Sequence, residues 1–288
     1  MSGRRTIALA TTAAARAQDE DFTPLAEALG ALGLQAEAVD WDDAAIAWDR
    51  YAAVLPRSTW DYVERLDAFL AWCDHAAARS RLFNPPALLR WNTDKHYLAD
   101  LAAAGVAVVD SHFIEPGQSP GDFPDHDEFV VKPAVGAGSR DARRFLRASR
   151  AAAVEHARGL LDRGRAVLVQ PYLAQVDAQG ETALIHFEGD FSHAIAKGPL
   201  LRRDEDATAA LFAPESITPR QPTAAERALA ARAVAAIPGG APLYARVDLL
   251  PSADGPRLLE LELTEPSLFF NHAPGAAARL AAALARRL

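Results

Sequence analysis

The stretch between residues 244 and 263 constrains the fold of this chain more than any other. Two segments, 244–250 and 257–263, alternate apolar and polar side chains, and the residues between them include Pro, Gly and Asp. Alternation with a period of two predicts strands, and turn formers between two such runs predict a hairpin. Because side chains two positions apart share a face, Glu260 and Glu262 should lie together. The leucines of the same strand should face the core, namely Leu259, Leu261 and Leu263.

The partner strand of this hairpin adds a third carboxylate. If both strands turn their apolar side chains to the same core, Asp248 lies on the side of Glu260 and Glu262. Like charges that face each other across a sheet are unfavourable unless something neutralises them. Mg²⁺ prefers carboxylate oxygens and would do so, whereas a solvated acidic face is the alternative that the alternation equally allows. Asp248, Glu260 and Glu262 are therefore candidate Mg²⁺ ligands.

Length and composition predict a globular protein of more than one domain. The 288 residues suffice for two or three compact domains, and 50% of them are hydrophobic. With 38 acidic against 30 basic residues, the net charge of −8 argues against sequence-independent binding of nucleic acid. The apolar runs predict neither a membrane span nor a signal peptide. The single cysteine, Cys73, excludes an internal disulfide and fits a cytoplasmic location.

The first ninety residues predict a parallel β-α-β unit. Strands are expected at 5–11 and 34–39, around a helix at 23–32. The loop after the first strand contains no glycine, which disfavours a dinucleotide-binding domain for hydride transfer. A further strand, 51–55, leads to Arg57, and ligands of open α/β sheets bind beyond the carboxyl ends of the strands. Arg57 is therefore a candidate for binding a substrate carboxylate, with a surface arginine as the alternative.

Two lysines lie where a positive charge is unfavourable without a partner. A helix is expected to begin near residue 93 and to end at Gly105, with Lys95 in its first turn, where a bound anion would offset the helix dipole. Lys132 belongs to a short apolar strand, 129–133, and an unpaired lysine is costly in a core. For Lys95 taken alone, a solvated surface position is the alternative.

A glycine-rich loop follows the strand of Lys132. Gly136, Gly138 and Ser139 leave backbone N–H groups free to approach an anion, as phosphate-binding loops do. The loop lacks the third glycine of the dinucleotide motif and the Gly-Lys-Ser/Thr of a P-loop. A Gly-x-Gly by itself is a weak signal, so the interpretation depends on the buried lysine upstream.

The second half of the chain predicts further strands and a lid. An apolar strand at 166–173 is broken by a proline, and a hairpin is expected at 181–197 around Gly189. Segment 202–222 mixes charges, prolines and alanines without a period, which predicts a mobile loop. Helices are expected at 149–163, 223–236 and 275–288, and residues 110–128 are expected to form a connection.

These elements in this order resemble the ATP-grasp superfamily, most strongly from Trp91 to the C-terminus. The motifs are a lysine at a helix start, Val-Val-Lys-Pro with a Gly/Ser loop, Val-Gln-Pro-Tyr-Leu, Lys-Gly-Pro, then Arg-x-Asp and Glu-x-Glu on paired strands. The resemblance implies an α/β (α+β) fold. A Rossmann-like N-terminal domain, 1–90, would precede two α+β lobes, 91–173 with the phosphate loop and 174–288 with the metal site, that hold ATP between them.

Within the superfamily, the chain is most similar to the ligases that close the D-cycloserine ring, which are related to prokaryotic glutathione synthetases. The similar stretches are Trp91-Asn-Thr-Asp-Lys95, Val135-Gly-Ala-Gly-Ser-Arg-Asp141, Phe191-Ser-His-Ala194 with Lys197-Gly-Pro199, and Leu259-Glu-Leu-Glu-Leu-Thr-Glu-Pro-Ser267. This similarity implies an ADP-forming, ATP- and Mg²⁺-dependent ligase that activates a small amino-acid carboxylate as an acyl phosphate. A nitrogen would then form a C–N bond, here within O-ureido-D-serine. An intermolecular amino-acid or peptide ligase and a non-catalytic ATP-binding regulatory protein are the alternatives.

The resemblance also implies contacts to the nucleotide and the metal. The phosphates of ATP would meet Lys95, Lys132, Lys197 and the loop of Gly136, Gly138 and Ser139. The adenine would meet Gln170, Tyr172 and Leu173, and the ribose hydroxyls would meet Asp177. One or two Mg²⁺ ions would bind Asp248, Glu260 and Glu262, although many relatives have asparagine where Glu262 stands.

Further residues are implied in the reaction and in substrate binding. Arg246, with Lys197, would stabilise the transferred phosphoryl group or orient the acyl phosphate. The acceptor pocket for a small amino-acid-like carboxylate would include Arg57, Ser267 and Asn271. A homodimer or a larger homo-oligomer is the default for a soluble enzyme of this kind.

Overall fold

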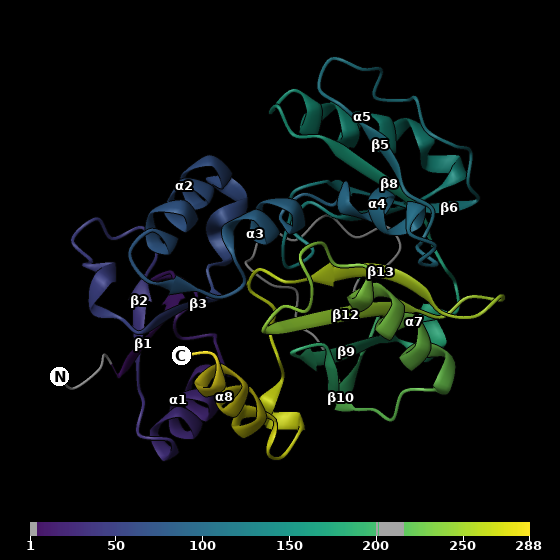
Figure 1. The fold of residues 1–288 in the computed structure, drawn as a ribbon. Coiled ribbons are helices and arrows are strands. Elements are labelled where there is room, and N and C mark those ends of the chain that lie inside the picture. The colour runs from purple at the N-terminus through teal and green to yellow at the C-terminus, as the bar shows by residue number, and fades with distance from the viewer. Residues whose placement is uncertain (1–4, 200, 202–215) are drawn as a thin grey trace.

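Three β-sheets organise the chain, of which the computed structural model describes residues 5–199, 201 and 216–288 (Figure 1). The N-terminal sheet is parallel and has the order β2-β1-β3-β4. Its strands are β1 (Thr6–Thr11), β2 (Gln35–Asp40), β3 (Ala53–Ser58) and β4 (Arg81–Leu82). The helices of this part are α1 (Phe22–Ala31), η1 (Trp48–Arg50), η2 (Trp60–Glu64), α2 (Leu66–Ala77) and α3 (Pro86–Asn92). The predicted parallel β-α-β unit is confirmed, with small shifts of its bounds.

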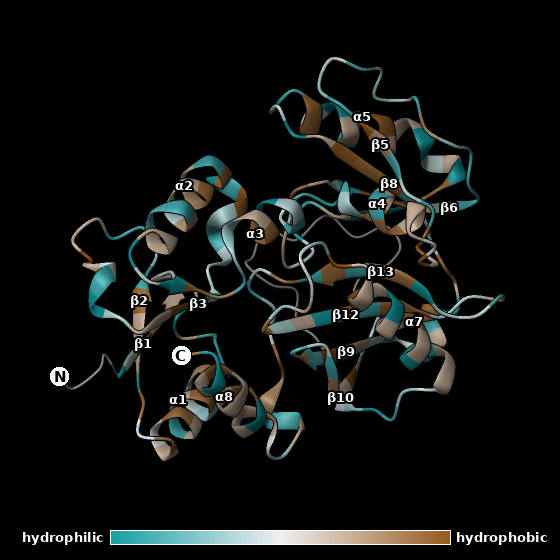
Figure 2. Cartoon of the chain, viewed as in Figure 1, coloured by the Kyte–Doolittle hydropathy of each residue, from teal (hydrophilic) through white to brown (hydrophobic). Residues whose placement is uncertain are grey.

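The second sheet is antiparallel, with the order β5-β8-β6-β7. Its strands are β5 (His112–Ile114), β6 (Glu128–Pro133), β7 (Arg143–Leu146) and β8 (Val167–Pro171). η3 (Arg147–Ser149) and α5 (Arg150–Leu161) lie between β7 and β8, and α6 (Val176–Gln179) follows β8. Helix α4 (Tyr97–Ala103) precedes β5, and its apolar residues pack in the core of the third sheet. Apolar residues of β8 and α5 form one core between helix and sheet (Figure 2). β5 and β7 were not expected from the sequence, because three or four residues are too few to show a period.

The third sheet is antiparallel and has the order β11-β10-β9-β12-β13. Its strands are β9 (Glu181–Phe187), β10 (Asp190–Lys197), β11 (Ile217–Pro219), β12 (Tyr244–Leu250) and β13 (Arg257–Glu262). Both predicted hairpins are confirmed. Helix α7 (Ala224–Ala235) covers one face, and a capping box between Thr223 and Glu226 begins it. The predicted lid at 202–222 lies largely outside the described residues, while its last part contains β11.

A β-bulge in the hairpin changes which side chains of β13 face the core. Asp248 pairs with Glu260, but the next residue, Leu249, pairs with Leu258, so Leu259 is the extra residue. Leu258 is therefore fully buried in the core, whereas Leu259 packs beside Tyr172 and Leu173. The expectation that Leu259 shares the core face with Leu261 is wrong, because a strict period of two does not continue through a bulge.

The helix expected at Lys95 also differs. α3 ends at Asn92 and α4 begins at Tyr97, so Lys95 lies in the turn between two short helices. Asn92 does not cap a helix; its side chain donates to Leu261 O and accepts from Leu263 N, at 2.7 Å each. Lys95 directly precedes His96, the N-cap of α4, and its Nζ donates to Gly136 O at 2.7 Å and lies 3.8 Å from Glu260 Oε1. Protein groups therefore offset its charge, and a bound anion is not required for that.

The C-terminal helix α8 (Ala276–Arg286) packs beside α1 (Figure 1). Its apolar face shares one core with the N-terminal sheet and the third sheet, through residues such as Leu280, Leu9 and Ile185. The end of the chain thereby joins two sheets that the sequence separates. Among the residues described, no helix is both long and apolar enough to cross a membrane.

Asn84 joins the N-terminal part to the third sheet through three backbone groups. Its side-chain amide donates to Tyr244 O at 3.0 Å and Leu263 O at 2.7 Å, and its oxygen accepts from Leu243 N at 2.9 Å. Asn84 is 1% exposed, so water cannot replace these partners. The side chain therefore satisfies strand-end groups that the sheet itself leaves unpaired.

Asn84→Ala is expected to lower the free energy of unfolding by about 3 kcal/mol, because it leaves buried donors and acceptors without partners. Urea denaturation followed by circular dichroism measures the change. Asn271→Ala, at an exposed asparagine, is the control and is expected to change it by less than about 0.5 kcal/mol. Equal effects of the two substitutions would contradict the role of Asn84.

Candidate active site

One cavity is bounded by all three sheets. The second sheet contributes β6, the loop after it and the end of β8, and the third sheet contributes β9, β10, β12 and β13. η2, directly after β3 of the N-terminal sheet, and the segment after β13 complete the wall. Most residues predicted from the sequence line it, namely Lys95, Lys132, Gly136, Gly138, Ser139, Gln170, Tyr172, Leu173, Lys197, Arg246, Asp248, Glu260, Glu262 and Ser267.

Lys132 connects the second sheet to the third. Its ammonium group donates to Glu260 Oε1 at 2.7 Å, and Lys95 Nζ lies 3.8 Å from the same oxygen. Burial opposes ionisation of Glu260, but the charges of Lys132 and Lys95 outweigh it and lower the pKa of its carboxyl to about 2. Burial lowers the pKa of Lys132, and the Glu260 carboxylate opposes that shift. The buried lysine predicted from the sequence thus has a partner 128 positions away.

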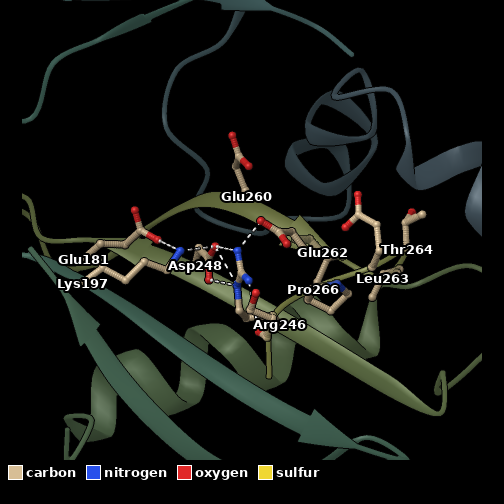
Figure 3. Close-up of polar contacts among 12 residues, drawn as sticks. Glu181, Lys197, Arg246, Asp248, Glu260, Glu262, Leu263, Thr264 and Pro266 are labelled. Atoms are coloured by element: carbon tan, nitrogen blue, oxygen red, sulfur yellow. Dashed lines mark hydrogen bonds and ion pairs between the residues drawn. The ribbon is translucent and has the colours of Figure 1, made fainter. Parts of the chain in front are cut away.

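Lys197 and Arg246 hold the carboxylates of the third sheet (Figure 3). Lys197 Nζ lies between Glu181 Oε1, at 2.5 Å, and Asp248 Oδ2, at 2.9 Å. Arg246 donates to both oxygens of Asp248, and its Nη2 lies 2.9 Å from Oδ2. Burial raises the pKa of Asp248, but Arg246 and Lys197 outweigh it and lower the pKa. Burial, with repulsion from Asp248 and despite Lys197, raises the pKa of Glu181 to about 7.

Glu262 also pairs with Arg246, through Nη2 and Oε1, and Glu260 points away from this group (Figure 3). Burial, aided by the nearby carboxylates of Asp248 and Glu265 and opposed by Arg246, raises the pKa of Glu262 to about 8. One arginine thus neutralises two carboxylates incompletely, and Glu262 retains a proton more readily than an ordinary glutamate.

The repulsion between the hairpin carboxylates is balanced by lysine and arginine. The sequence-based argument that a divalent cation must neutralise them is therefore wrong in its premise. Within the residues described, no three His, Cys, Asp or Glu side chains converge as a metal centre. The side chains of Glu260 and Glu262 are still 22% and 26% exposed, at a cavity wall, and their hard oxygens fit Mg²⁺. Asp248, at 3% exposure and held by Arg246 and Lys197, is less accessible.

The glycine-rich loop is held in a shape that exposes its backbone to the cavity. Gly138 and Ser139 have φ of 61° and 59°, in the left-handed region that a serine rarely adopts. Lys95 Nζ donates to Gly136 O at 2.7 Å, and Arg165 Nη2 donates to Val135 O at 3.0 Å. These bonds to carbonyl groups fix the loop and leave its N–H groups available for an anion.

The far end of the cavity is apolar and aromatic. Tyr172 and Leu173 line it together with Leu259, and the Arg144 guanidinium stacks on the Tyr172 ring at 3.4 Å from its centroid. Gln170 is 2% exposed and donates to Ser111 Oγ at 3.0 Å. A flat, apolar slot with few polar groups suits a planar base.

Three predicted site residues are not part of the cavity wall. Asp177 pairs with Arg144 at 3.0 Å and accepts a hydrogen bond from the Tyr172 hydroxyl at 2.5 Å. It therefore holds the side chains at the aromatic end of the cavity without lining the cavity itself. Asn271 is exposed and lies 3.5 Å from Glu20. Arg57 is 1% exposed, which also excludes the surface alternative. The strand-end rule predicted its position correctly but not its contacts.

Arg57 fixes the backbone of the segment after β13 through hydrogen bonds, without lining the cavity. It donates to Pro266 O at 3.0 Å and to Asp21 at 3.3 Å, and Asp21 accepts from the backbone N–H of Leu268 and, at 2.9 Å, of Phe270. These bonds hold the residue between them, Phe269, at a φ of 55° immediately before η4 (Phe270–His272). Ser267 and Phe269 consequently reach the cavity while Arg57 does not.

Several cavity residues were missed in the sequence, namely Trp60, Tyr62, Arg140, Glu181, Glu265 and Phe269. Trp60 and Tyr62 follow the carboxyl end of β3, so the rule that selected Arg57 could have found them. Glu265 lies within the Leu259–Ser267 stretch that supported the resemblance. Glu181 begins a predicted strand, but no sequence signal placed its carboxylate beside Lys197.

Known proteins are similar to this chain in both sequence and architecture. Residues 7–84 match the family model for the N-terminal domain of D-cycloserine synthetase DcsG. Cycloserine biosynthesis protein DcsG of Streptomyces lavendulae is 42% identical over 296 aligned residues, which cover 98% of each chain. The crystal structure of D-cycloserine synthetase DcsG has a TM-score of 0.92 and 41% identity, over 98% of this chain and 99% of that one.

A more distant structure shares the fold alone. The ATP-grasp ligase PsnB, solved with a phosphomimetic variant of its minimal precursor, Mg and ADP, has a TM-score of 0.61 and 19% identity over 98% of both chains. The three sheets around one cavity lined by paired cations and carboxylates therefore define an ATP-grasp ligase. At 42% identity over 98% of each chain, the protein belongs to the family of the cycloserine biosynthesis protein DcsG.

Glu262→Gln is expected to change how stability depends on pH in the protein without nucleotide. Because the pKa of Glu262 is raised to about 8 from an ordinary 4.5, its protonated form stabilises the fold, and this contribution is lost as the pH rises between these values. Wild type should lose on the order of 1 kcal/mol relative to Glu262→Gln between pH 5 and 8.

Urea denaturation at pH 5, 6.5 and 8 measures this difference. Glu155→Gln, at an exposed carboxylate of α5, is the matched control and should run parallel to wild type. A difference between wild type and Glu262→Gln that stays constant with pH would contradict the raised pKa.

Proposed function

We propose that this protein is an ADP-forming, ATP- and Mg²⁺-dependent ligase that activates the carboxylate of a small amino acid as an acyl phosphate and closes a C–N bond. The proposed substrate is O-ureido-D-serine and the product D-cycloserine. The observation that supports this most is a set of cations around one cavity, among them Lys95, Lys132, Lys197 and Arg246, together with the glycine-rich loop that lines the same cavity. Membership of the DcsG family supports the choice of substrate.

The residues at the cavity match the parts of a nucleotide. The aromatic and apolar end would take the adenine, with Tyr172, Leu173 and Leu259 against its ring. The lysines and the glycine-rich loop would neutralise and position the phosphates, which accounts for most of catalysis in phosphoryl transfer. Glu260 and Glu262, with Asp248, would hold Mg²⁺, which supplies further charge neutralisation at the phosphate oxygens when bound.

The proposed reaction has three balanced steps. An oxygen of the substrate carboxylate attacks the γ-phosphorus of ATP, and ADP leaves. The ureido nitrogen that is bonded to oxygen then attacks the acyl carbon, inorganic phosphate leaves, and the nitrogen gives up a proton. Water finally cleaves the bond between this nitrogen and the carbamoyl carbon, and the carbamoyl group leaves as CO2 and NH3. Arg246, held between Asp248, Glu262 and Ser267 O, would stabilise charge on the transferred phosphoryl group, and Lys197 would approach it from β10.

Two alternatives differ from this proposal in measurable ways. An intermolecular amino-acid or peptide ligase would use the same first step, and PsnB, a ligase solved with a precursor peptide, shares the fold. A non-catalytic ATP-binding regulatory protein would bind nucleotide without consuming it. In either case we expect a homo-oligomer in the cytoplasm that binds no nucleic acid.

Phosphate and ADP are expected to be released only when O-ureido-D-serine or a related carboxylate is present with Mg²⁺ and ATP. A screen of D- and L-amino acids, ureido derivatives and short peptides measures this release. The mass of the product then separates the enzymes, because cyclisation with loss of the carbamoyl group gives a product lighter than the substrate, whereas ligation joins two molecules. Release that no carboxylate stimulates would contradict the enzyme, and a product with the mass of two joined substrates would contradict cyclisation.

Lys132→Met and Glu260→Gln are each expected to lower kcat/KM by roughly 100-fold or more, because both residues act on the phosphates or their metal. The double variant Lys132→Met/Glu260→Gln tests whether a loss of folding causes the effect. It removes both charges of the Lys132–Glu260 pair and leaves Lys95 with its hydrogen bond to Gly136 O, so it should stay within about 2 kcal/mol of wild type in urea denaturation. Near wild-type rates in both single variants would contradict the assignment.

A further inference from the structure

Glu265 differs from the other carboxylates of the cavity. Five line it, namely Glu181, Asp248, Glu260, Glu262 and Glu265. The first four are each paired with a lysine or arginine. Over the described parts of the chain, Glu265 forms no ion pair, although it is only 5% exposed. A buried carboxylate without a cation is unfavourable, which suggests that a ligand supplies one.

The surroundings of Glu265 define what this ligand can be. Glu265 lines the cavity together with Tyr62, Arg246 and Lys95. Trp60 Nε1 donates to Glu265 O at 3.1 Å and fixes the backbone. Trp60, Tyr62 and Phe269 add aromatic surface to the same wall, and aromatic faces attract cations.

Arg246 lies within reach of the same short segment. Its Nη1 donates to Ser267 O at 3.2 Å, two residues beyond Glu265, and its guanidinium lies 5.5 Å from the centre of the Phe269 ring. A substrate whose reacting carboxylate lies at Arg246 therefore has Glu265 beside it. In an α-amino acid the ammonium nitrogen is two bonds from the carboxylate carbon, so one small molecule can meet both groups.

We propose that Glu265 is a specificity-determining residue that binds the α-ammonium group of the substrate in a pocket walled by Trp60, Tyr62 and Phe269. This inference rests on the proposed function, because it assumes that the reacting carboxylate lies at Arg246. It adds that the ligase requires an α-amino acid and rejects the same carboxylic acid without its amino group. A carboxylic acid without the ammonium leaves Glu265 buried and unpaired, which disfavours its binding.

Calorimetry with a non-hydrolysable ATP analogue and Mg²⁺ tests the pocket without turnover. The ligands are O-ureido-D-serine and 3-(ureidooxy)propanoate, which differ only in the amino group. Wild type is expected to bind the first at least roughly tenfold more tightly, and Glu265→Gln to weaken it by roughly 30-fold while changing the second less than twofold. Tyr62→Phe, which removes only a hydroxyl, should weaken the first severalfold and not the second.

A surface control and the affinity for Mg²⁺ complete the design. Glu155→Gln should leave the affinity for each of the two ligands unchanged. Equal binding of the two ligands by wild type, or no binding of either, overturns the proposal. So does a loss of Mg²⁺ affinity in Glu265→Gln with unchanged discrimination, because Glu265 would then belong to the metal.

The two proposals fail in different ways. Wild-type turnover without discrimination between the ligands would overturn the role of Glu265 and keep the ligase. Discrimination in binding by a protein that releases no phosphate would support the pocket and contradict the ligase.

Discussion

The pairing of buried carboxylates with lysines and arginines is the interaction on which the site depends. The hairpin of β12 and β13 places three carboxylates on one face, and their neutralising cations come from three places, Lys132 on β6, Lys197 on β10 and Arg246 on β12 itself. Because an unpaired buried charge is costly, these pairs also hold the second sheet against the third. The charges that fix the architecture are those that a triphosphate and its metal would use under the proposed function, in which binding and folding would share one set of residues.

The N-terminal sheet contributes to the site mainly by supporting it. Asp21 and Arg57 are buried beside the segment after β13 and bind its backbone, while Asn84 satisfies strand ends of the third sheet. Of the described residues in this part of the chain, Trp60 and Tyr62 of η2 and Asn92 at the end of α3 reach the cavity directly. An arginine at a strand end can therefore shape a pocket through backbone contacts without touching its contents. The cavity wall at Trp60 and Glu265 is consequently built by segments 205 positions apart.

Most strands and helices could be predicted from periodicity, and most of the site residues predicted from motifs line the cavity. The errors have physical causes. The bulge at Leu259 interrupts the period of two, and the amide of Asn92 binds a sheet edge where a helix cap was expected. Strands as short as β5 give no periodic signal. Arg57 and Asp177 were expected at the ligand because their residue types suit it, but both bind protein groups that no local pattern identifies. The division at residues 90 and 173 remains a prediction.

The sequence by itself determined the two hairpins, the parallel β-α-β unit, the glycine-rich loop and the acidic face of β13, because each follows from residues close together in the chain. Only the tertiary structure decided which cation meets which carboxylate, that Leu259 faces the aromatic end, and that Glu265 lacks an ion pair among the residues described. Such facts depend on contacts between residues as far apart as Lys132 and Glu260, 128 positions along the chain. Local periodicity sets the direction of a side chain, but only the packing of distant segments sets its partner.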